Sequence, residues 1–222
     1  MRIAHIASEV APWCKSGGLG DVLGALPGAQ ARMGADVSVF LPLHRAARQA
    51  ADKHKLALHA TGVTVSSRIA GHDVSGHFLA HVDRDGVKTF LLDCQRFFDR
   101  HGLYTDENGR SYADNGVRYA FFCQAVLQAA SRLCGGAPDV LHAHDWQAAL
   151  IPIYLRHAPV PTVITIHNLA YQGTFHKDLL PAIGLDWDVF HPGCAEFHDH
   201  LGLLKGGICL LYTSDAADEV LG

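Results

Sequence analysis

The sequence lacks any run of about 18 apolar residues, the length that a membrane-spanning helix requires. Its first residues, MRIAHIAS, contain a single basic side chain before a run that predicts a strand, so they lack the layout of a secretory signal peptide. The formal net charge is -4, with both signs interspersed and no basic stripe, which argues against nucleic-acid binding. We therefore expect a cytoplasmic protein that binds neither membranes nor nucleic acids.

No pair among the six cysteines has the CxxC spacing, which favours reduced and mostly buried thiols over a disulfide framework. The sequence also lacks a GxSxG elbow, a cysteine with a recognisable histidine partner and an evident pair of carboxylates. Hydrolysis through a nucleophile therefore has little support. What the chain has is 222 residues, 49% of them hydrophobic, which suffices for one domain with a sizeable core.

Strand and helix patterns alternate along the chain. Apolar runs at 2–8 and 36–41 indicate buried parallel strands. Two later runs, at 139–144 and 162–167, indicate further strands on either side of a helical pattern over 147–156. The predicted fold class is α/β, with an open, mainly parallel Rossmann-like sheet and ligands beyond the carboxyl ends of its strands.

Two longer helices and a hairpin complete this prediction. The first helix would face the sheet through residues spaced by four, three and four positions: Val22, Leu26, Ala29 and Met33. The second would begin after Asp114 and end before Gly135. Between the helices, residues 56–98 contain short β-type runs, two of which flank an Asp85-Gly86 turn. We expect an antiparallel hairpin inserted at the edge of the sheet.

The segment KSGGLGD, residues 15–21, is a candidate phosphate-binding loop. Gly17 and Gly18 let backbone amides approach a ligand, the following helix start favours negative charge, and Lys15 adds a positive charge. The loop is neither a Walker A sequence nor the dinucleotide fingerprint, because its glycines are spaced GxGxxxG. A strand-to-helix turn that needs glycine only for its backbone angles would give the same pattern.

His142 and His144 fall on the same side of a predicted strand, directly before Asp145 and Trp146. A zinc site needs three or four ligands, and the nearest further candidates lie on separate segments without a metal-binding spacing: His167, His191, His198 and His200. The alternative is a polar rim, in which Asp145 accepts hydrogen bonds from sugar hydroxyls or orients a histidine. Trp146 would pack nearby or stack on a sugar ring.

A third group of polar residues follows the strand predicted at 162–167. The β-branched run ends in side chains that hydrogen-bond: His167, Asn168, Tyr171 and Gln172. Such side chains suit a carbohydrate ligand. If the strands are parallel, this group, the glycine loop and Asp145 meet at one edge of the sheet.

Three segments together resemble the amino-terminal motifs of bacterial glycogen and starch synthases: EVAPWCKSGGLGDVLGALP, DVLHAHDWQAALIPIYL and TVITIHNLAYQGTF. The resemblance extends from residue 1 to about residue 208, in the family's order. It implies a retaining glucosyltransferase that extends α-1,4-glucan from ADP-glucose. It also implies the two-domain GT-B fold and no metal or other cofactor.

The resemblance assigns roles to individual residues. Three would be catalytic: Asp21, Asp145 and His167. Five would bind substrate: Glu9, Lys15, Gly17, Gly18 and Asn168. Among them, Lys15 and the two glycines would contact the donor phosphates. The polar segments themselves add four further candidates for substrate binding: His144, Trp146, Tyr171 and Gln172. The family's mechanism is usually argued as same-face attack, which suits residues that position groups and stabilise charge without an attacking carboxylate.

The sequence departs from the family at three places. Phe98 stands where the family often has a substrate-contacting tyrosine, and Gly20 replaces a more usual alanine. Residues 209–222 do not resemble the family's continuation, so we expect a domain at 1–208 followed by a truncation or assembly scar. The carboxyl-terminal nucleotide-binding domain would be absent, and the chain alone inactive.

Two rival functions follow from the same residues. A non-catalytic glucan-binding module would fit a chain without the second half of the enzyme. A metal-dependent hydrolase would use His142, His144 and Asp145 with another histidine. A nicotinamide dehydrogenase has less support, because no acidic residue ends the strand at 36–41 to hold a ribose.

Overall fold

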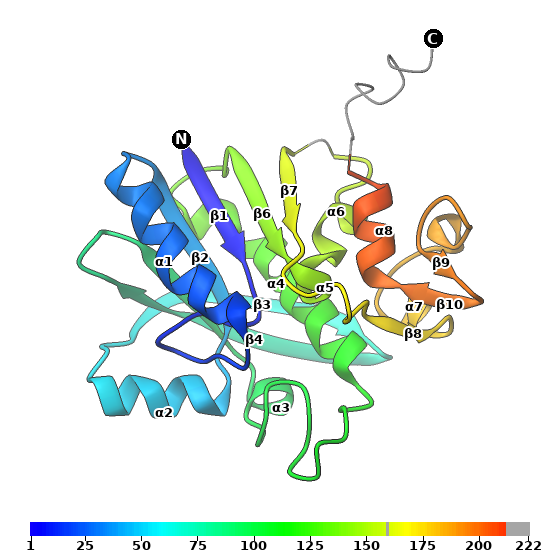
Figure 1. Cartoon of the computed structure of the whole chain (residues 1–222), viewed down its shortest axis with the longest axis horizontal. Coiled ribbons are helices and arrows are strands. Elements are labelled where there is room, and N and C mark those ends of the chain that lie inside the picture. Colours follow the sequence, from blue (N-terminus) through cyan, green and yellow to red (C-terminus); the bar gives the residue numbers. More distant parts are fainter. Residues whose placement is uncertain (159, 212–222) are drawn as a thin grey trace.

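Seven strands form one twisted sheet in the order β3-β4-β5-β2-β1-β6-β7 (Figure 1). The computed structural model describes residues 1–158 and 160–211. Five neighbouring strands run parallel: β5 (Lys88–Asp93), β2 (Asp36–Pro42), β1 (Arg2–Ile6), β6 (Val140–His144) and β7 (Thr162–Thr165). The mainly parallel sheet predicted from the apolar runs is therefore confirmed.

The hairpin insertion also forms at one edge of this sheet. Strand β4 (His72–Val82) pairs antiparallel with both β3 (His59–Ile69) and β5. The turn between β4 and β5 contains Gly86 at a φ of +83°, a left-handed conformation that favours glycine. The Asp85-Gly86 turn was therefore a correct indication of the hairpin.

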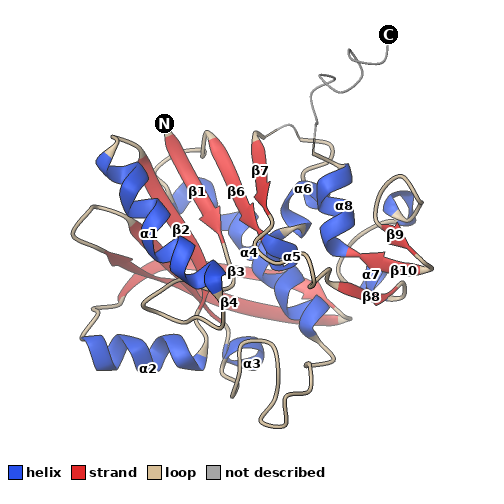
Figure 2. Ribbon diagram, in the orientation of Figure 1, coloured by secondary structure: helices blue, strands red, loops and turns tan. Residues whose placement is uncertain are grey.

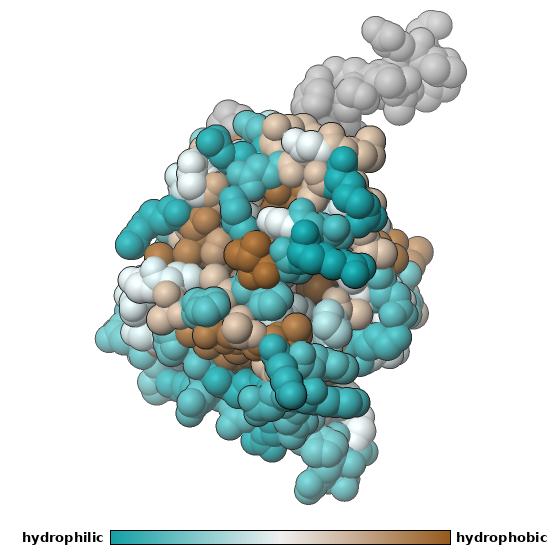
Figure 3. Space-filling view, turned by 90° about the vertical axis from the view of Figure 1, so that its left-hand side faces the viewer, coloured by the Kyte–Doolittle hydropathy of each residue, from teal (hydrophilic) through white to brown (hydrophobic). Residues whose placement is uncertain are grey.

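Helices cover both faces of the sheet (Figure 2). Helices α1 (Gly18–Arg32) and α2 (Arg45–His54) share one apolar core with β2. Helix α4 (Asn115–Leu133) packs on the other face, together with the short α3 (Gln95–Phe98). The side of the molecule on the left of Figure 1 is mostly hydrophilic, with hydrophobic residues gathered near its middle (Figure 3).

The predicted apolar face of α1 was wrong at its two ends, Val22 and Met33, while Leu26 and Ala29 are partly buried. The buried side chains are Leu19, Leu23 and Pro27, whereas Val22 is 40% and Met33 is 87% exposed. Both sets of residues satisfy helical spacing and differ in phase by about one residue, so periodicity alone could not choose between them.

Helix α4 has its predicted extent, but its first turn differs in detail. Asp114 precedes the helix without making a side-chain capping bond. Its carboxylate instead accepts two hydrogen bonds from Arg100, of 2.6 and 2.5 Å. Gly135, at a φ of +69°, follows the helix end, as predicted.

Beyond β6 the chain forms short elements that close the far side of the molecule (Figure 1). Helices α5 (Asp145–Ala148), α6 (Leu150–Tyr154) and α8 (Leu203–Cys209) pack together. A small antiparallel sheet, β8-β10-β9, lies beside them, and its strands are β8 (Thr174–His176), β9 (Glu196–Phe197) and β10 (His200–Gly202). Helix α7 (Leu179–Ala182) and a 3-10 turn (Trp187–Val189) complete the region.

The cysteine prediction is confirmed. All six thiols are free, and Cys209 alone among them is exposed. Among the described residues, no helix is both long and apolar enough to cross a membrane. Of the predicted tail at 209–222, all but 209–211 lies outside the described residues, and Leu210 and Leu211 are half-buried.

Candidate functional site

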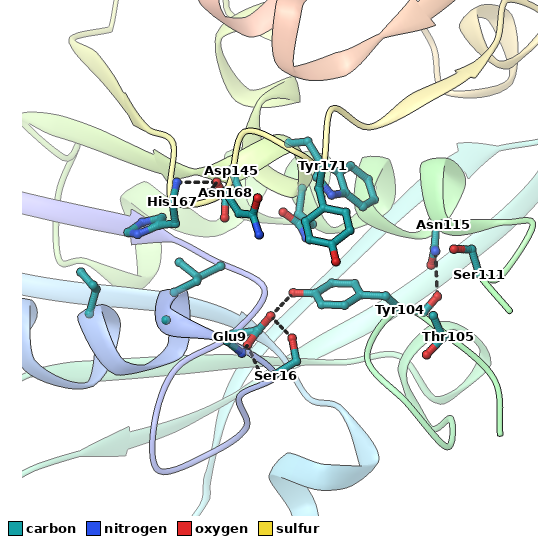
Figure 4. A pocket seen from close by; sticks show the side chains of 16 residues that line it. Glu9, Ser16, Tyr104, Thr105, Ser111, Asn115, Asp145, His167, Asn168 and Tyr171 are labelled. Carbon is teal, nitrogen blue, oxygen red and sulfur yellow. Dashed lines mark hydrogen bonds between the residues drawn. The ribbon is translucent and has the colours of Figure 1, made fainter. Parts of the chain in front are cut away.

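A pocket of about 590 Å³ opens at the carboxyl ends of the parallel strands. It lies where the strand order reverses, because the chain first builds outward from β1 to β2 and later adds β6 on the other side. Ligands bind at such a switch point in open α/β sheets. Its lining comes from loops distant in sequence: Glu9, Ser16, Gly17, Gly18, Leu19, Val22, Tyr104, Thr105, Ser111, Asn115, Asp145, Trp146, Gln147, His167, Asn168 and Tyr171 (Figure 4).

Glu9 holds the glycine loop in place. This carboxylate is buried and accepts hydrogen bonds from the backbone amides of Ser16 and Gly17, and from the Ser16 hydroxyl at 2.7 Å. The Tyr104 hydroxyl donates a further bond of 2.6 Å to Glu9 Oε1 (Figure 4). The amides of Ser16 and Gly17 are therefore already satisfied by Glu9, and Gly18 begins helix α1 beside the pocket.

Lys15 and Asp21 lie at the rim and not in the pocket lining. Their side chains form an ion pair of 2.8 Å and are 55% and 61% exposed. An exposed pair of this kind adds little stability, so Lys15 can exchange Asp21 for another anion at low cost.

Asp145 holds a loop on the opposite side of the pocket, as Glu9 holds the glycine loop. It is buried at the end of β6, and its Oδ1 accepts the backbone N–H groups of His167 at 2.7 Å and Asn168 at 3.3 Å (Figure 4). Its φ of +56° is in the left-handed region, which costs a residue with a side chain about 1 kcal/mol or more. The sequence placed Asp145 at the site, and the structure shows that it orients the backbone of the neighbouring loop.

Histidines lie beneath the pocket floor. His144 is fully buried and bonds His5 through Nε2 and His167 through Nδ1, both at 3.0 Å. Burial, with smaller contributions from neighbouring histidines, lowers the pKa of His144 to about 2 and that of His142 to about 4. These imidazoles are neutral near pH 7.

The remaining predicted residues divide between packing and lining. Trp146 packs edge-on against Tyr119, with ring centroids 5.3 Å apart, and also reaches the pocket. Tyr171 lines the pocket and is 65% exposed. Gln172 lies outside the pocket lining, where its side-chain amide donates to the carbonyl of Leu169 at 2.6 Å.

One wall of the pocket had no prediction from the sequence. It consists of Tyr104, Thr105, Ser111 and Asn115, from the loop between α3 and α4 and the start of α4. The buried Arg118 shapes this loop by donating to the carbonyl of Leu103 at 3.0 Å. Residues 97–127, which contain them, are similar to the corresponding family segment, but no binding role was assigned there, and the role of these residues follows from contacts across the fold.

The pocket therefore combines two carboxylates, several hydroxyls and amides, and one imidazole. No lysine or arginine occurs among the described residues that line it. Such a lining suits a ligand with many hydroxyl groups, since hydroxyls can both donate to the carboxylates and accept from the amides. Any charge on a phosphate would have to be met at the rim, where Lys15 lies.

Comparison with known proteins agrees with this geometry. The family model of the starch synthase catalytic domain matches residues 2–217. The chain belongs to this family. Glycogen synthase from Myxococcus xanthus is 44% identical over 99% of the chain, and that of Granulibacter bethesdensis is 40% identical over 99%. The catalytic domain of starch synthase IV from Arabidopsis thaliana, bound to ADP and acarbose, superposes with a TM-score of 0.74 at 28% identity, covering 94% of this chain and 43% of that one.

The chain spans about half the length of the curated relatives it matches, 46% of the first and 45% of the second. The resemblance to starch synthases inferred from the three motifs is confirmed, as is the half of the GT-B fold that it implied. The match extends beyond residue 208, into the segment predicted to be a scar. That prediction stays untested, because most of this segment lies outside the described residues.

The structure shows the surroundings of two residues that depart from the starch synthase pattern, Phe98 and Gly20. Phe98 is fully buried, with its ring edge-on to His44 and under the guanidinium of Arg118, and it does not line the pocket. At Gly20, an added Cβ would lie 2.4 Å from the Cβ of Lys15. The loop therefore packs closer to the helix here than an alanine would permit.

Proposed function

We propose that this chain is the amino-terminal, acceptor-side half of a retaining glucosyltransferase that extends α-1,4-glucan from ADP-glucose. The observation that carries the proposal is the meeting of three motifs in one pocket at the switch point. The glycine loop, Asp145 and the His167-Asn168 turn lie far apart in sequence but line the same 590 Å³ space. The likeness to a starch synthase bound to ADP and acarbose supports a nucleotide and an oligosaccharide as ligand classes.

The charges around the pocket support a division of roles. Lys15 at the rim would contact a donor phosphate, together with Gly18 at the start of helix α1, because the Gly17 amide already donates to Glu9. His167 and Asn168 would contact the transferred glucose, while Glu9 and Asp145 keep the two loops in position. The reaction would then depend on positioning and on stabilisation of developing charge, without an enzyme nucleophile, metal or organic cofactor. Asp21 would act at the reaction centre only after release from Lys15.

A non-catalytic glucan-binding module is the second candidate. The absence of basic side chains from the described pocket lining favours it, because the pocket by itself offers hydroxyl chemistry and little for a pyrophosphate. In the first proposal, the half of the enzyme that the relatives have beyond the matched region would supply the rest of the nucleotide site.

A chimera separates the two candidates. Residues 1–208 would be joined to the remaining half of the Myxococcus xanthus glycogen synthase, the 44% identical relative. We expect this chimera to incorporate glucose from ADP-glucose into malto-oligosaccharide, with UDP-glucose tested in parallel. The intact relative serves as the positive control.

The chain alone is expected to bind malto-oligosaccharide, as measured by calorimetry, without turnover of ADP-glucose. A folded but inactive chimera, beside a chain that still binds malto-oligosaccharide, would reject the transferase and favour the binding module. Loss of both properties would reject both candidates.

A further inference from the structure

A continuous chain of hydrogen bonds runs beneath the pocket from helix α1 to His167. The side-chain oxygen of Gln30 lies 2.7 Å from His5 Nε2. His5 Nδ1 lies 3.0 Å from His144 Nε2, and His144 Nδ1 lies 3.0 Å from His167 Nε2. His5 and His144 are fully buried, and Gln30 is partly buried. The four residues belong to four different elements: α1, β1, β6 and the loop after β7.

The donors and acceptors in this series of hydrogen bonds can be arranged in only one way when Gln30 presents its oxygen. An amide oxygen accepts, so His5 must carry its proton on Nε2 and offer a lone pair at Nδ1. His144 must then donate from Nε2, and its Nδ1 accepts from His167 Nε2. The geometry points to a relay, formed by Gln30, His5 and His144, that fixes the tautomer of His167 and leaves its Nδ1 as a hydrogen-bond acceptor at the pocket.

The relay requires His5 and His144 to hold one proton each, and their full burial opposes a second one. Desolvation lowers the pKa of His5, and desolvation with neighbouring histidines lowers that of His144 to about 2. A second proton on either ring would place two N–H groups face to face and break the chain. The groups that face His144 are His5, His142 and His167, all of them imidazoles.

A metal ion is the competing explanation, because one ring nitrogen from each of His5, His142 and His144 lies within 4.8 Å of the others. Two observations oppose it. Both nitrogens of His5 and both of His144 already take part in hydrogen bonds. The ring of His142 stacks on that of His144, with centroids 4.2 Å apart and planes at 27°, so their lone pairs lie in nearly parallel planes. His142 Nε2 is instead 2.7 Å from the Thr165 hydroxyl.

The consequence for substrate rests on the proposed function. A bare Nδ1 on His167 accepts a hydrogen bond, so it selects a hydroxyl group of the sugar and rejects an acceptor-only group such as a phosphate oxygen. His5, His144 and Gln30 are then positioning residues, which act on the ligand only through His167. Gln30 is outside the pocket lining, which makes it the residue of choice for a test.

The test reads the tautomers directly from the 222-residue chain. Long-range ¹H–¹⁵N correlation spectra of protein labelled with ¹⁵N-histidine at about pH 7 distinguish Nε2–H, Nδ1–H and doubly protonated rings. Single His5→Asn, His144→Asn and His167→Asn variants assign the signals. We expect all three rings to be neutral and protonated at Nε2, with the other tautomer disfavoured roughly tenfold, the effect of one net hydrogen bond.

Two substitutions at Gln30 form a matched pair. Gln30→Glu keeps an acceptor and should leave the three tautomers unchanged. Gln30→Lys offers only donors and should move all three rings together toward Nδ1–H. Nδ1–H or rapidly averaged signals for His144 or His167 in the unmodified chain would overturn the relay. Unchanged tautomers in a folded Gln30→Lys variant would overturn it too, as would stoichiometric binding of added Zn²⁺ that shifts the His5 and His144 signals. None of these readouts depends on glucosyl transfer, so an inactive chimera would reject the proposed function and leave the relay standing.

Discussion

Replacing Tyr104 with phenylalanine removes a hydroxyl that joins the unpredicted wall of the pocket to Glu9, which holds the glycine loop. Tyr104 Oη donates to Glu9 Oε1 at 2.6 Å and accepts from the Ser8 hydroxyl at 2.7 Å. Ser8 is fully buried and Glu9 is 3% exposed. Burial, the negative charge of Glu9 and the bond to it raise the pKa of Tyr104 well above its usual value, so the hydroxyl keeps its proton.

The size of the effect follows from these contacts. A hydrogen bond to a charged group contributes about 1.5 to 3 kcal/mol, and the buried Ser8 hydroxyl would also lose its partner. Glu9 keeps its bonds to Ser16 and Gly17, so its charge does not become unpaired. We therefore expect Tyr104→Phe to lower the free energy of unfolding by about 2 to 3 kcal/mol. For a chain of this length, that corresponds to a fall in Tm of roughly 4 to 12 °C.

Urea and thermal unfolding of the 222-residue chain would measure this change. Tyr171→Phe is the matched control, because Tyr171 lines the same pocket but is 65% exposed, and its loss should stay within about 0.5 kcal/mol. Equal stability of the two variants would refute the reasoning. It would mean that the Glu9–Tyr104 bond does not hold the loop in solution.

Three further predictions concern a turn, the buried histidines and the loop lysine. Gly173→Ala should lower the free energy of unfolding by about 2 to 4 kcal/mol, because Gly173 has a φ of +63° and an added Cβ would lie 2.7 Å from the ring of Trp146. The control Gly109→Ala, at a similar φ but with no atom near the added Cβ, should lower it by only about 1 kcal/mol. Burial lowers the pKa of His44 to about 3 and of His144 to about 2, below the unfolded value near 6.5. The unfolded chain then binds more protons, so the free energy of unfolding should fall as pH drops below about 6.5, by up to about 1.4 kcal/mol per pH unit for each histidine. Urea unfolding at several pH values would measure this, and a pH-independent midpoint between about pH 7.5 and 5.5 would contradict it. In the chimera, Lys15→Ala should reduce kcat/KM for ADP-glucose about tenfold to 100-fold without changing the Tm, and unchanged kinetics would remove Lys15 from the donor site.

The elements of the fold that could be predicted are those decided by local pattern. Buried parallel strands are continuous apolar runs, so 36–41 was identified within one residue of β2. The hairpin was visible because Gly86 marks a turn that other residues adopt less easily. The face of α1 was not predictable, since Leu19 and Val22 fit the helical period equally well and only the sheet decides which is buried.

About half of the residues that line the candidate site could be placed from the sequence, because strands that end in polar residues bring those residues to one edge of the sheet. Asp145 and His167 were found in this way. Tyr104 was missed because its partner Glu9 lies 95 residues away and no local pattern joins them. His5 was missed for a different reason: inside a short apolar strand, a lone histidine looks like any other core residue, and its bond to His144 spans 139 residues.

The two sides of the pocket are held by the same kind of contact, and this explains why the chain has a defined site. On one side Glu9, just after β1, accepts the amides of Ser16 and Gly17. On the other side Asp145, at the end of β6, accepts the amides at the start of the loop after β7. Each carboxylate follows a buried strand and satisfies amides that a loop cannot bond internally. Because both loops are tied to adjacent strands of one sheet, the distance between them is set by the sheet and needs no ligand or second domain to hold it.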